Sequence, residues 1–150
     1  MNESSTNGPV ASVLVFLHEI ASLPPETKVR LLGCVVDYDM VKGQLILEHA
    51  YPKHILPTPR VSVDVNLSLE TVDSSVLRTG AWVNIIGYTR ITGLKSRRSK
   101  AHLHQSRDRD ELPAMQAILI WPTRVLRIED YEITLEEQRS IARQSKSLRK

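Results

Sequence analysis

The sequence predicts a mainly β protein, a small closed barrel of five strands with a short helix between strands three and four and another at the C-terminus. Five segments carry the apolar patterning of strands, and one helical pattern separates the third segment from the fourth. The first segment, residues 28–38, is long and contains Gly33. Glycine weakens a strand unless a bend requires it, so a bent strand shared by two sheets fits a closed barrel. An ordinary strand with a tolerated glycine is the alternative.

Residues 60–66 have the clearest strand pattern, because valines at every second position alternate with Ser62, Asp64 and Asn66, which are expected to face outward. Before Gly33, the first strand alternates in the same way. The second strand, 44–49, has two leucines on one face. The expected core consists of the inward side of 115–119 and Val29, Leu31, Val61, Val63, Val65, Val83 and Ile85.

Turn and breaker residues separate these strands. Asp39 and the pair Lys42-Gly43 suit a hairpin turn after the first strand, and three prolines make residues 50–59 a loop. The fourth strand, 81–91, contains a second internal glycine, and the fifth, 114–121, is ended by a proline.

Two segments have helical signals. Residues 71–78 fit a short helix capped by Thr71 or Asp73. Further on, Thr134 and Glu137 have the spacing of a capping box, which predicts a C-terminal helix over 134–147.

The order strand-strand-strand, helix, strand-strand is that of the OB-fold, a five-stranded Greek-key barrel. Ferredoxin-like and SH3-like folds place their helices elsewhere or lack them. We therefore expect a flexible N-terminus over 1–11, a single OB-fold domain over 12–147 and a tail over 148–150. Within the domain, 12–16 is expected to add a short edge strand and 18–21 a turn of helix.

The positive charge is concentrated in two places. Residues 92–113 hold six basic and three acidic residues, and residues 139–150 hold five basic residues and no acidic one, although the whole chain has a net charge of only +3. The rest of the chain, called the body below, is therefore mildly acidic. A barrel that binds nucleic-acid phosphates by itself is expected to be basic instead. The polar segment 92–113 is predicted to be a flexible basic insertion. Its candidate nucleic-acid contacts are Arg97, Arg98, Lys100, Arg107 and Arg109.

Few features indicate catalysis, a cofactor or secretion. Cys34 is the single cysteine and lies in an apolar run, so a small buried side chain is expected rather than a reactive thiol. His102 and His104 lack further metal ligands at suitable spacing. Phosphate-binding loops, nucleophile elbows and metalloprotease helices are absent, and the N-terminus lacks the order of a signal peptide. We expect a soluble intracellular protein that is not an enzyme and carries no cofactor or metal.

The predicted outer surface indicates a protein partner. OB-folds that hold single strands use aromatic residues for base stacking, and the second and third strands offer none. On the fourth strand, Trp82, Ile86 and Tyr88 are expected to face out, and the fifth strand is apolar on both faces. Coverage by the chain's own N-terminal segment and C-terminal helix is an alternative. An autonomous single-strand-binding module that uses the basic insertion is a second.

The sequence also resembles a known family. Four runs carry the likeness in order: Val29-Arg-Leu-Leu-Gly-Cys-Val-Val-Asp-Tyr-Asp39, Leu45-Ile-Leu-Glu-His-Ala-Tyr-Pro52, Val63-Asp-Val-Asn-Leu67 and Gly80-Ala-Trp-Val-Asn-Ile-Ile-Gly-Tyr88. They resemble the smallest subunit of the telomere-capping CST complex, most closely in fungi, an OB-fold related to the small subunit of replication protein A. The resemblance covers roughly 12–91 and 114–147 and leaves the basic insertion unexplained.

This resemblance implies a nuclear protein at the chromosome telomere. It implies a heterodimer with the middle OB-fold subunit and, through it, contact with the large subunit. The complex would hold the single-stranded G-rich overhang, limit telomerase and engage DNA polymerase α–primase for C-strand fill-in. Arg30 matches a partner-contacting arginine, and the helix opened by Thr134 matches the partner-binding helix. The outward side of the fourth strand adds to these contacts. The expected partner contacts are therefore Arg30, Trp82, Tyr88, Tyr131, Leu135, Gln138, Arg139 and Ala142.

Overall fold

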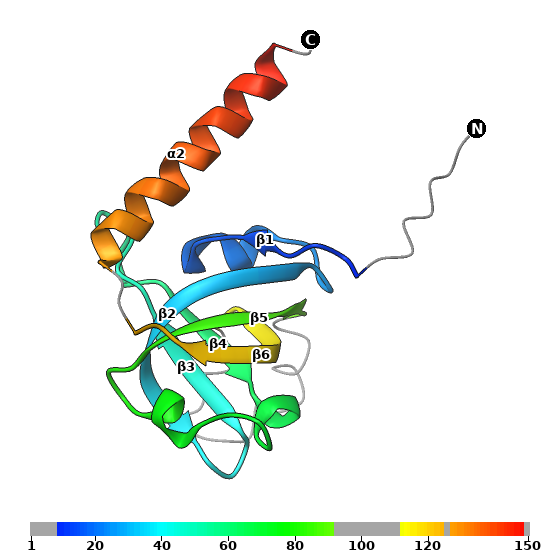
Figure 1. Ribbon diagram of the computed structural model, residues 1–150, viewed down its shortest axis with the longest axis vertical. Coiled ribbons are helices and arrows are strands. Elements are labelled where there is room, and N and C mark those ends of the chain that lie inside the picture. The colour runs from blue at the N-terminus through cyan, green and yellow to red at the C-terminus, as the bar shows by residue number, and fades with distance from the viewer. Residues whose placement is uncertain (1–8, 92–111, 125–126, 149–150) are drawn as a thin grey trace, which may run out of the picture.

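The computed structural model of this chain describes residues 9–91, 112–124 and 127–148, and Figure 1 shows its ribbon. All five arginines and lysines expected to contact nucleic acid, and the predicted insertion up to residue 111, lie outside the described residues. The strands are β1 (Val13–Leu14), β2 (Lys28–Asp39), β3 (Gln44–Glu48), β4 (Arg60–Asp64), β5 (Trp82–Arg90) and β6 (Ala114–Pro122). The helices are the 3-10 turns η1 (Leu17–Ser22), η2 (Asn66–Ser68) and η3 (Ser74–Leu77), and the α-helix α2 (Ile128–Ser147).

The strands form one sheet that closes on itself. Their order is β1-β2-β3-β4-β6-β5, and β2 also pairs with β5, which completes a five-stranded barrel with β1 added in parallel on β2. The 3-10 turns of residues 66–77 lie between the third and fourth barrel strands. This topology confirms the predicted OB-fold. The short parallel β1 was expected as an edge strand and makes the sheet six-stranded.

Strand β2 closes the barrel because it takes part in both halves of the sheet. Its first half pairs with β5 from Lys28 to Cys34, and its second half pairs with β3 from Cys34 to Asp39. Gly33 lies where the two pairings meet, and a Cβ there would lie 3.0 Å from the Cβ of Leu47. The glycine therefore permits a close approach of β3 at the bend, as the bent-strand prediction requires.

Gly87 serves a similar purpose in β5. The register between β5 and β6 shifts at this point, since Ile86 pairs with Leu119 and Gly87 pairs with Ala117, so that Ile118 is the extra residue of a β-bulge. A Cβ on Gly87 would lie 2.1 Å from the carbonyl oxygen of Gln116. Only glycine fits this backbone approach.

The barrel interior is apolar. Every named residue of the predicted core is fully buried, as are Met115 and Ala117 in the predicted segment 115–119, and Leu45 and Leu47 join the core from β3. Ser62, between the core residues Val61 and Val63, lies on the outer side of β4 as predicted, but it is buried there. Its backbone N–H donates to the carbonyl of Pro113 at 2.9 Å, and its hydroxyl accepts a hydrogen bond from the Gln44 side chain, so both polar groups are satisfied.

One of the predicted helices needed correction. The C-terminal helix begins at Ile128, with Arg127 at the N-cap, so Thr134 is an internal residue and the capping-box prediction was wrong. Glu129 and Asp130 occupy its first turn, where acidic side chains favour the helix dipole. The short helix predicted within 71–78 is the 3-10 turn η3, and Asp73, one of the two predicted caps, accepts from the backbone N–H of Ser75.

Two further observations concern the described residues alone. None of the helices among them is both long and apolar enough to cross a bilayer. Within 9–91, 112–124 and 127–148, no cluster of three or more histidine, cysteine or acidic side chains could hold a metal ion. Cys34 is only half-buried, and burial followed by the nearby charge of Glu48 raises the pKa of its thiol, which keeps the thiol protonated.

Candidate protein-binding surface at the helix–barrel junction

Helix α2 docks on the barrel through its first half alone. Figure 1 shows the helix crossing the end of the barrel beside η1 and then rising away from it, with its C-terminal end clear of the sheet. Leu135, on the barrel side, is the one fully buried residue of α2 and is 2 % exposed. Every residue of 141–148 is exposed. The helix therefore has a docked half and a projecting half.

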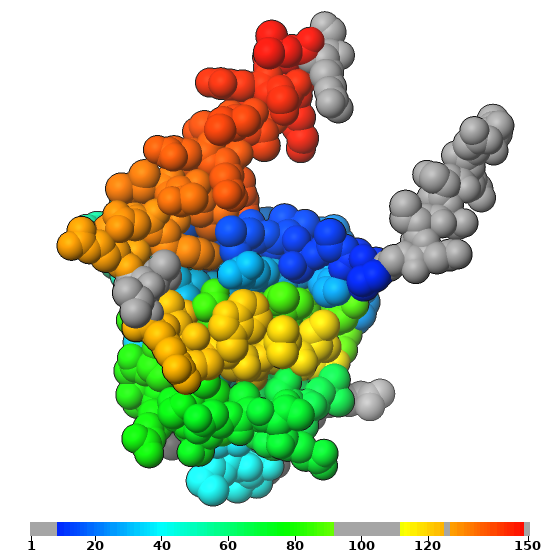
Figure 2. Space-filling view, viewed as in Figure 1, coloured from blue at the N-terminus to red at the C-terminus, as the bar shows by residue number. Residues whose placement is uncertain are grey.

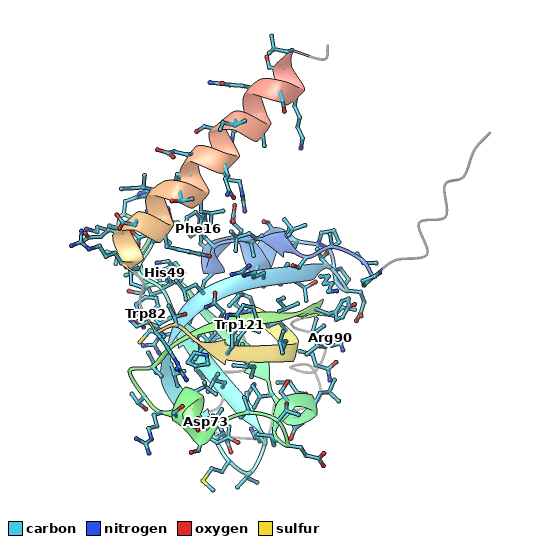
Figure 3. The ribbon with its side chains drawn as sticks, viewed as in Figure 1. Phe16, His49, Asp73, Trp82, Arg90 and Trp121 are labelled. Atoms are coloured by element: carbon cyan, nitrogen blue, oxygen red, sulfur yellow. The ribbon has the colours of Figure 1, made fainter. Side chains whose placement is uncertain are left out.

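An aromatic cluster receives the docked half (Figure 3). The ring of Phe16, just before η1, lies 4.5 Å from that of Tyr51 and meets Tyr131 of α2 edge-on at 6.3 Å. His49 lies T-shaped to Trp82 of β5 at 5.4 Å. Aromatic pairs at these separations stabilise beyond the area that they bury. Three segments far apart in sequence therefore meet under α2.

Polar contacts complete the docking on either side of the cluster. The buried His49 places its Nε2 2.9 Å from Glu132 Oε1 on the helix. Arg139, one turn after Leu135, forms a two-pronged ion pair with Glu19 of η1 and donates to the carbonyl of Leu14 at 2.8 Å. Glu19 also accepts from the backbone N–H of Phe16 at 2.7 Å, so a single carboxylate connects η1 to the helix.

Tyr131 lies between the aromatic cluster and these polar contacts. Its hydroxyl is buried and makes no hydrogen bond with any of the described residues. Burial is the main cause that raises the pKa of Tyr131 to about 12, and the cations of Arg30 and Arg139 lower it by less. The hydroxyl is therefore neutral at physiological pH.

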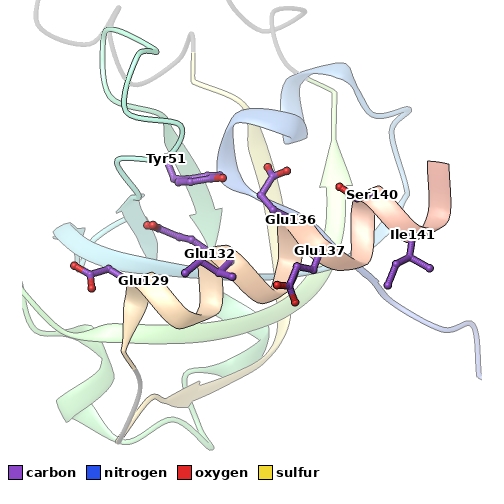
Figure 4. A pocket seen from close by; sticks show the side chains of 8 residues that line it. Tyr51, Glu129, Glu132, Glu136, Glu137, Ser140 and Ile141 are labelled. Carbon is purple, nitrogen blue, oxygen red and sulfur yellow. The ribbon is translucent and has the colours of Figure 1, made fainter. Parts of the chain in front are cut away.

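A groove runs along α2 from Glu129 to Ile141, from the docked half to the start of the projecting half (Figure 4). Its volume is about 570 Å³, and its walls are Tyr51, Glu129, Glu132, Ile133, Glu136, Glu137, Ser140 and Ile141. Ile133 and Ile141 are 57 % and 66 % exposed. Burial, and next to it the charge of Glu136, raises the pKa of Tyr51. The groove thus combines exposed isoleucines with four carboxylates and no basic side chain.

The outer face of the sheet continues this surface. The guanidinium of Arg30 lies over the ring of Trp121 at 5.2 Å from its centroid. The register places Ile86 between Arg30 and Leu119, and Leu119 is exposed. A cation stacked on a half-buried indole beside exposed aliphatic side chains is typical of protein-binding surfaces.

The structure divides the expected partner contacts into two groups. Leu135 and Arg139 contribute to the chain's own docking, and Tyr131 and Trp82 lie in the aromatic cluster, so these four are not freely exposed anchors. Arg30, Gln138 and Ala142 are exposed, and Tyr88 is half-exposed on the outer face of β5. Their role in binding a partner stays a prediction. The alternative, that the chain itself covers the outer face of the sheet, fits Trp82 in the aromatic cluster but not Ile118 and Leu119, which are exposed.

Sequence reasoning missed several residues of this surface. His49 continues the inward alternation of Leu45 and Leu47, so the period of β3 could have predicted its burial. Glu19 and Trp121 gave no such signal, because their partners Arg139 and Arg30 are distant in sequence.

Comparison with known proteins agrees with this architecture. No curated protein sequence matches the chain significantly. A solved chain of the S. pombe Stn1–Ten1 complex is 22% identical, covers 89% of this chain and 96% of its own, and has a TM-score of 0.62. Telomere capping protein Ten1 from Saccharomyces pombe is also 22% identical, covers 87% of this chain and 99% of its own, and has a TM-score of 0.60.

Replication protein A from U. maydis, solved with single-stranded DNA, has the same fold at 14% identity and a TM-score of 0.52, covering 86% of this chain and 90% of its own. These structural likenesses show the fold. The family model described as "Ten1: Telomere capping, CST complex subunit" matches residues 2–136, which is most of the sequence. The chain therefore belongs to the Ten1 family of telomere-capping CST complex subunits.

Proposed function

We propose that this chain is a non-catalytic subunit that binds the middle OB-fold subunit, Stn1, and that α2 together with the outer face of the sheet is the contact. One observation carries the proposal. The second half of α2 projects beyond the barrel with exposed aliphatic residues, although helices in monomeric proteins bury such residues against their own core. A helix of this kind needs a partner.

The chemistry of the surface specifies that partner. Ile133 and Ile141 offer apolar anchors, and the glutamates between them favour a basic amphipathic helix. The exposed Arg30 on Trp121 offers a second anchor on the sheet. Interface energy is concentrated in a few such aliphatic, aromatic and arginine side chains. The docked half of α2 would then hold the projecting half at a fixed angle for the partner.

Binding to Stn1 tests this proposal. Ile133→Glu with Ile141→Glu places two charges on the groove without touching Leu135, so we expect loss of binding in calorimetry while the circular dichroism spectrum is unchanged. Arg30→Glu should weaken binding by about tenfold or more, as expected for an anchor worth about 2 kcal/mol.

A matched control has the same chemistry elsewhere on the barrel. Leu56, in the loop between β3 and β4, is even more exposed than these isoleucines, and Leu56→Glu should leave binding to Stn1 unchanged. Normal binding by the Ile133/Ile141 double variant would reject α2 as the contact.

Single-stranded DNA is proposed to bind mainly through the whole complex, in the nucleus at the telomere. β3 and β4 offer no aromatic side chain for base stacking, and the mildly acidic body repels phosphates. Weak binding by the isolated chain would depend on Arg97, Arg98 and Lys100. The assembled complex would hold the overhang, limit telomerase and support C-strand fill-in by DNA polymerase α–primase.

Titration with a labelled oligonucleotide at two salt concentrations tests this part. Neutralising those three basic residues together should remove most binding by the isolated chain and reduce its salt dependence. Tight binding that survives both the substitutions and moderate salt would instead favour an autonomous single-strand-binding module.

A further inference from the structure

The turn between β2 and β3 exposes two large apolar side chains. Met40 is 81 % exposed and Val41 is 96 % exposed. Figure 2 shows this turn as a knob at the end of the molecule opposite α2. Turns of this kind normally carry glycine, asparagine or other polar residues. Nothing in the barrel packing requires an apolar pair at this position.

The turn is fixed in position rather than loose. The Asp39 carboxylate accepts from the backbone N–H groups of Val41 and Lys42 at 3.0 and 3.1 Å. The side-chain amide of Asn66 donates to the carbonyl of Lys42 at 2.9 Å, and Gly43 adopts a φ of 64° that allows the reversal. A turn held at both ends has little conformational entropy to lose when it binds.

A second apolar element lies next to the turn. Leu67 follows Asn66 directly in η2 and is 64 % exposed, and Leu69 is also exposed. Because Asn66 donates a hydrogen bond to Lys42 of the turn, Leu67 directly follows a residue that contacts the turn. Met40, Val41, Leu67 and Leu69 together are called the distal apolar tip.

The charges around the distal apolar tip are mostly negative. Residues 37–43 and 64–73 contain five acidic residues and one basic residue. Asp64, Glu70 and Asp73 are exposed among them. In OB-folds the loop between the first two barrel strands often contacts oligonucleotides, but an acidic rim repels phosphates. The same rim attracts lysine and arginine.

We infer that the distal apolar tip is a second protein-docking surface, which takes a Lys/Arg-rich segment of a partner carrying large apolar residues. The apolar side chains of that segment contact Met40, Val41 and Leu67. Its cations lie against the exposed carboxylates of Asp64 and Glu70. Because the tip is at the opposite end of the barrel from α2, it can be occupied while α2 holds another subunit. This inference does not depend on the proposed Stn1 contact.

Fluorescence anisotropy on the full-length chain tests the tip with a labelled peptide of alternating lysine and leucine. Met40→Ser with Val41→Ser should weaken peptide binding by about tenfold or more, as expected for loss of interface anchors. Glu70→Lys should weaken peptide binding more at low salt than at moderate salt, because salt screens the attraction between the peptide's lysines and the carboxylates. Peptides with glutamate in place of lysine, or serine in place of leucine, should bind far more weakly.

The α2 groove is also acidic and apolar, so the same peptide is expected to bind there as well, and the tip is tested in a background with Ile133→Ser and Ile141→Ser. In that background the Met40/Val41 change should still weaken the remaining peptide binding, whereas the control Leu56→Ser, in the loop between β3 and β4, should leave it unchanged. In the otherwise wild-type chain, the Met40/Val41 variant should keep wild-type binding to Stn1. The inference is overturned if no peptide binding remains in the groove-variant background, if the Met40/Val41 change does not weaken it, or if a labelled oligo(dT) binds the tip more tightly than the peptide does. Sedimentation showing a wild-type dimer that the tip variant abolishes would identify a second copy as the occupant and would also overturn it.

Discussion

Leu135→Ala tests whether the first half of α2 is held by docking. The Leu135 side chain is 2 % exposed, and truncating a buried leucine to alanine typically costs about 2–5 kcal/mol. The helix end can relax toward the barrel, so we expect the lower part of this range, about 2–3 kcal/mol. An isolated helix of this length is marginal in water, so loss of docking exposes its amides to exchange.

Native-state hydrogen exchange measures the effect where it arises. A loss of about 2–3 kcal/mol corresponds to an acceleration of roughly 30- to 150-fold for amides between Tyr131 and Arg139. The exchange rates of amides in β2 and β4 should change by less than about threefold, because their hydrogen bonds belong to the barrel sheet and do not depend on α2. The control Ile141→Ala removes an exposed side chain of the same helix and should cost less than about 0.5 kcal/mol.

Two results would refute this reasoning. Unchanged exchange in α2 would show that Leu135 does not hold the helix. An equal acceleration in α2 and in the barrel strands would show that helix and barrel unfold as one cooperative unit rather than separating at the junction.

Three further outcomes follow from the same contacts. Arg139→Ala removes the ion pair with Glu19 and should cost about 1–3 kcal/mol in urea unfolding, with Arg139→Lys restoring only part of it; no loss would mean that the pair is solvent-screened. Tyr131→Phe removes a buried hydroxyl without a partner, so the free energy of unfolding at pH 7 should stay equal or rise slightly. Because the folded-state pKa of Tyr131 is raised to about 12, wild-type stability should be complete below pH of about 10 and fall as the pH rises toward 12, and the Phe variant should lack this component. Gly87→Ala places a Cβ against the carbonyl of Gln116 and should lower the melting temperature strongly or prevent soluble expression; a near-wild-type melting temperature would contradict the bulge geometry.

The barrel could be predicted because its signals are local. Alternating valines such as Val61 and Val63 have one face to bury, and a period of two leaves no choice about which residues face inward. Gly33 and Gly87 indicated close approaches that the sheet then uses. The hairpin turn at Asp39 was predictable for the same reason, since turn chemistry depends on neighbouring residues.

The boundaries of the helices were harder to predict from the sequence. The spacing of Thr134 and Glu137 matches a capping box, yet the helix starts at Ile128. Tertiary packing decided this, because Tyr131 and Leu135 must lie on one face to meet the aromatic cluster. A capping pattern inside a helix whose first turn is already stabilised has no consequence.

The sequence by itself determined the closed barrel, its core and its family likeness, because each depends on periodicity, turn residues or the order of short runs. Only the tertiary structure decided what the surface residues do. It turned Leu135 and Arg139 into docking residues of the chain's own helix, paired Arg30 with Trp121, and left Met40 and Val41 exposed at the far end. These outcomes depend on contacts between segments distant along the chain, and a local pattern carries no information about which distant side chain will lie opposite.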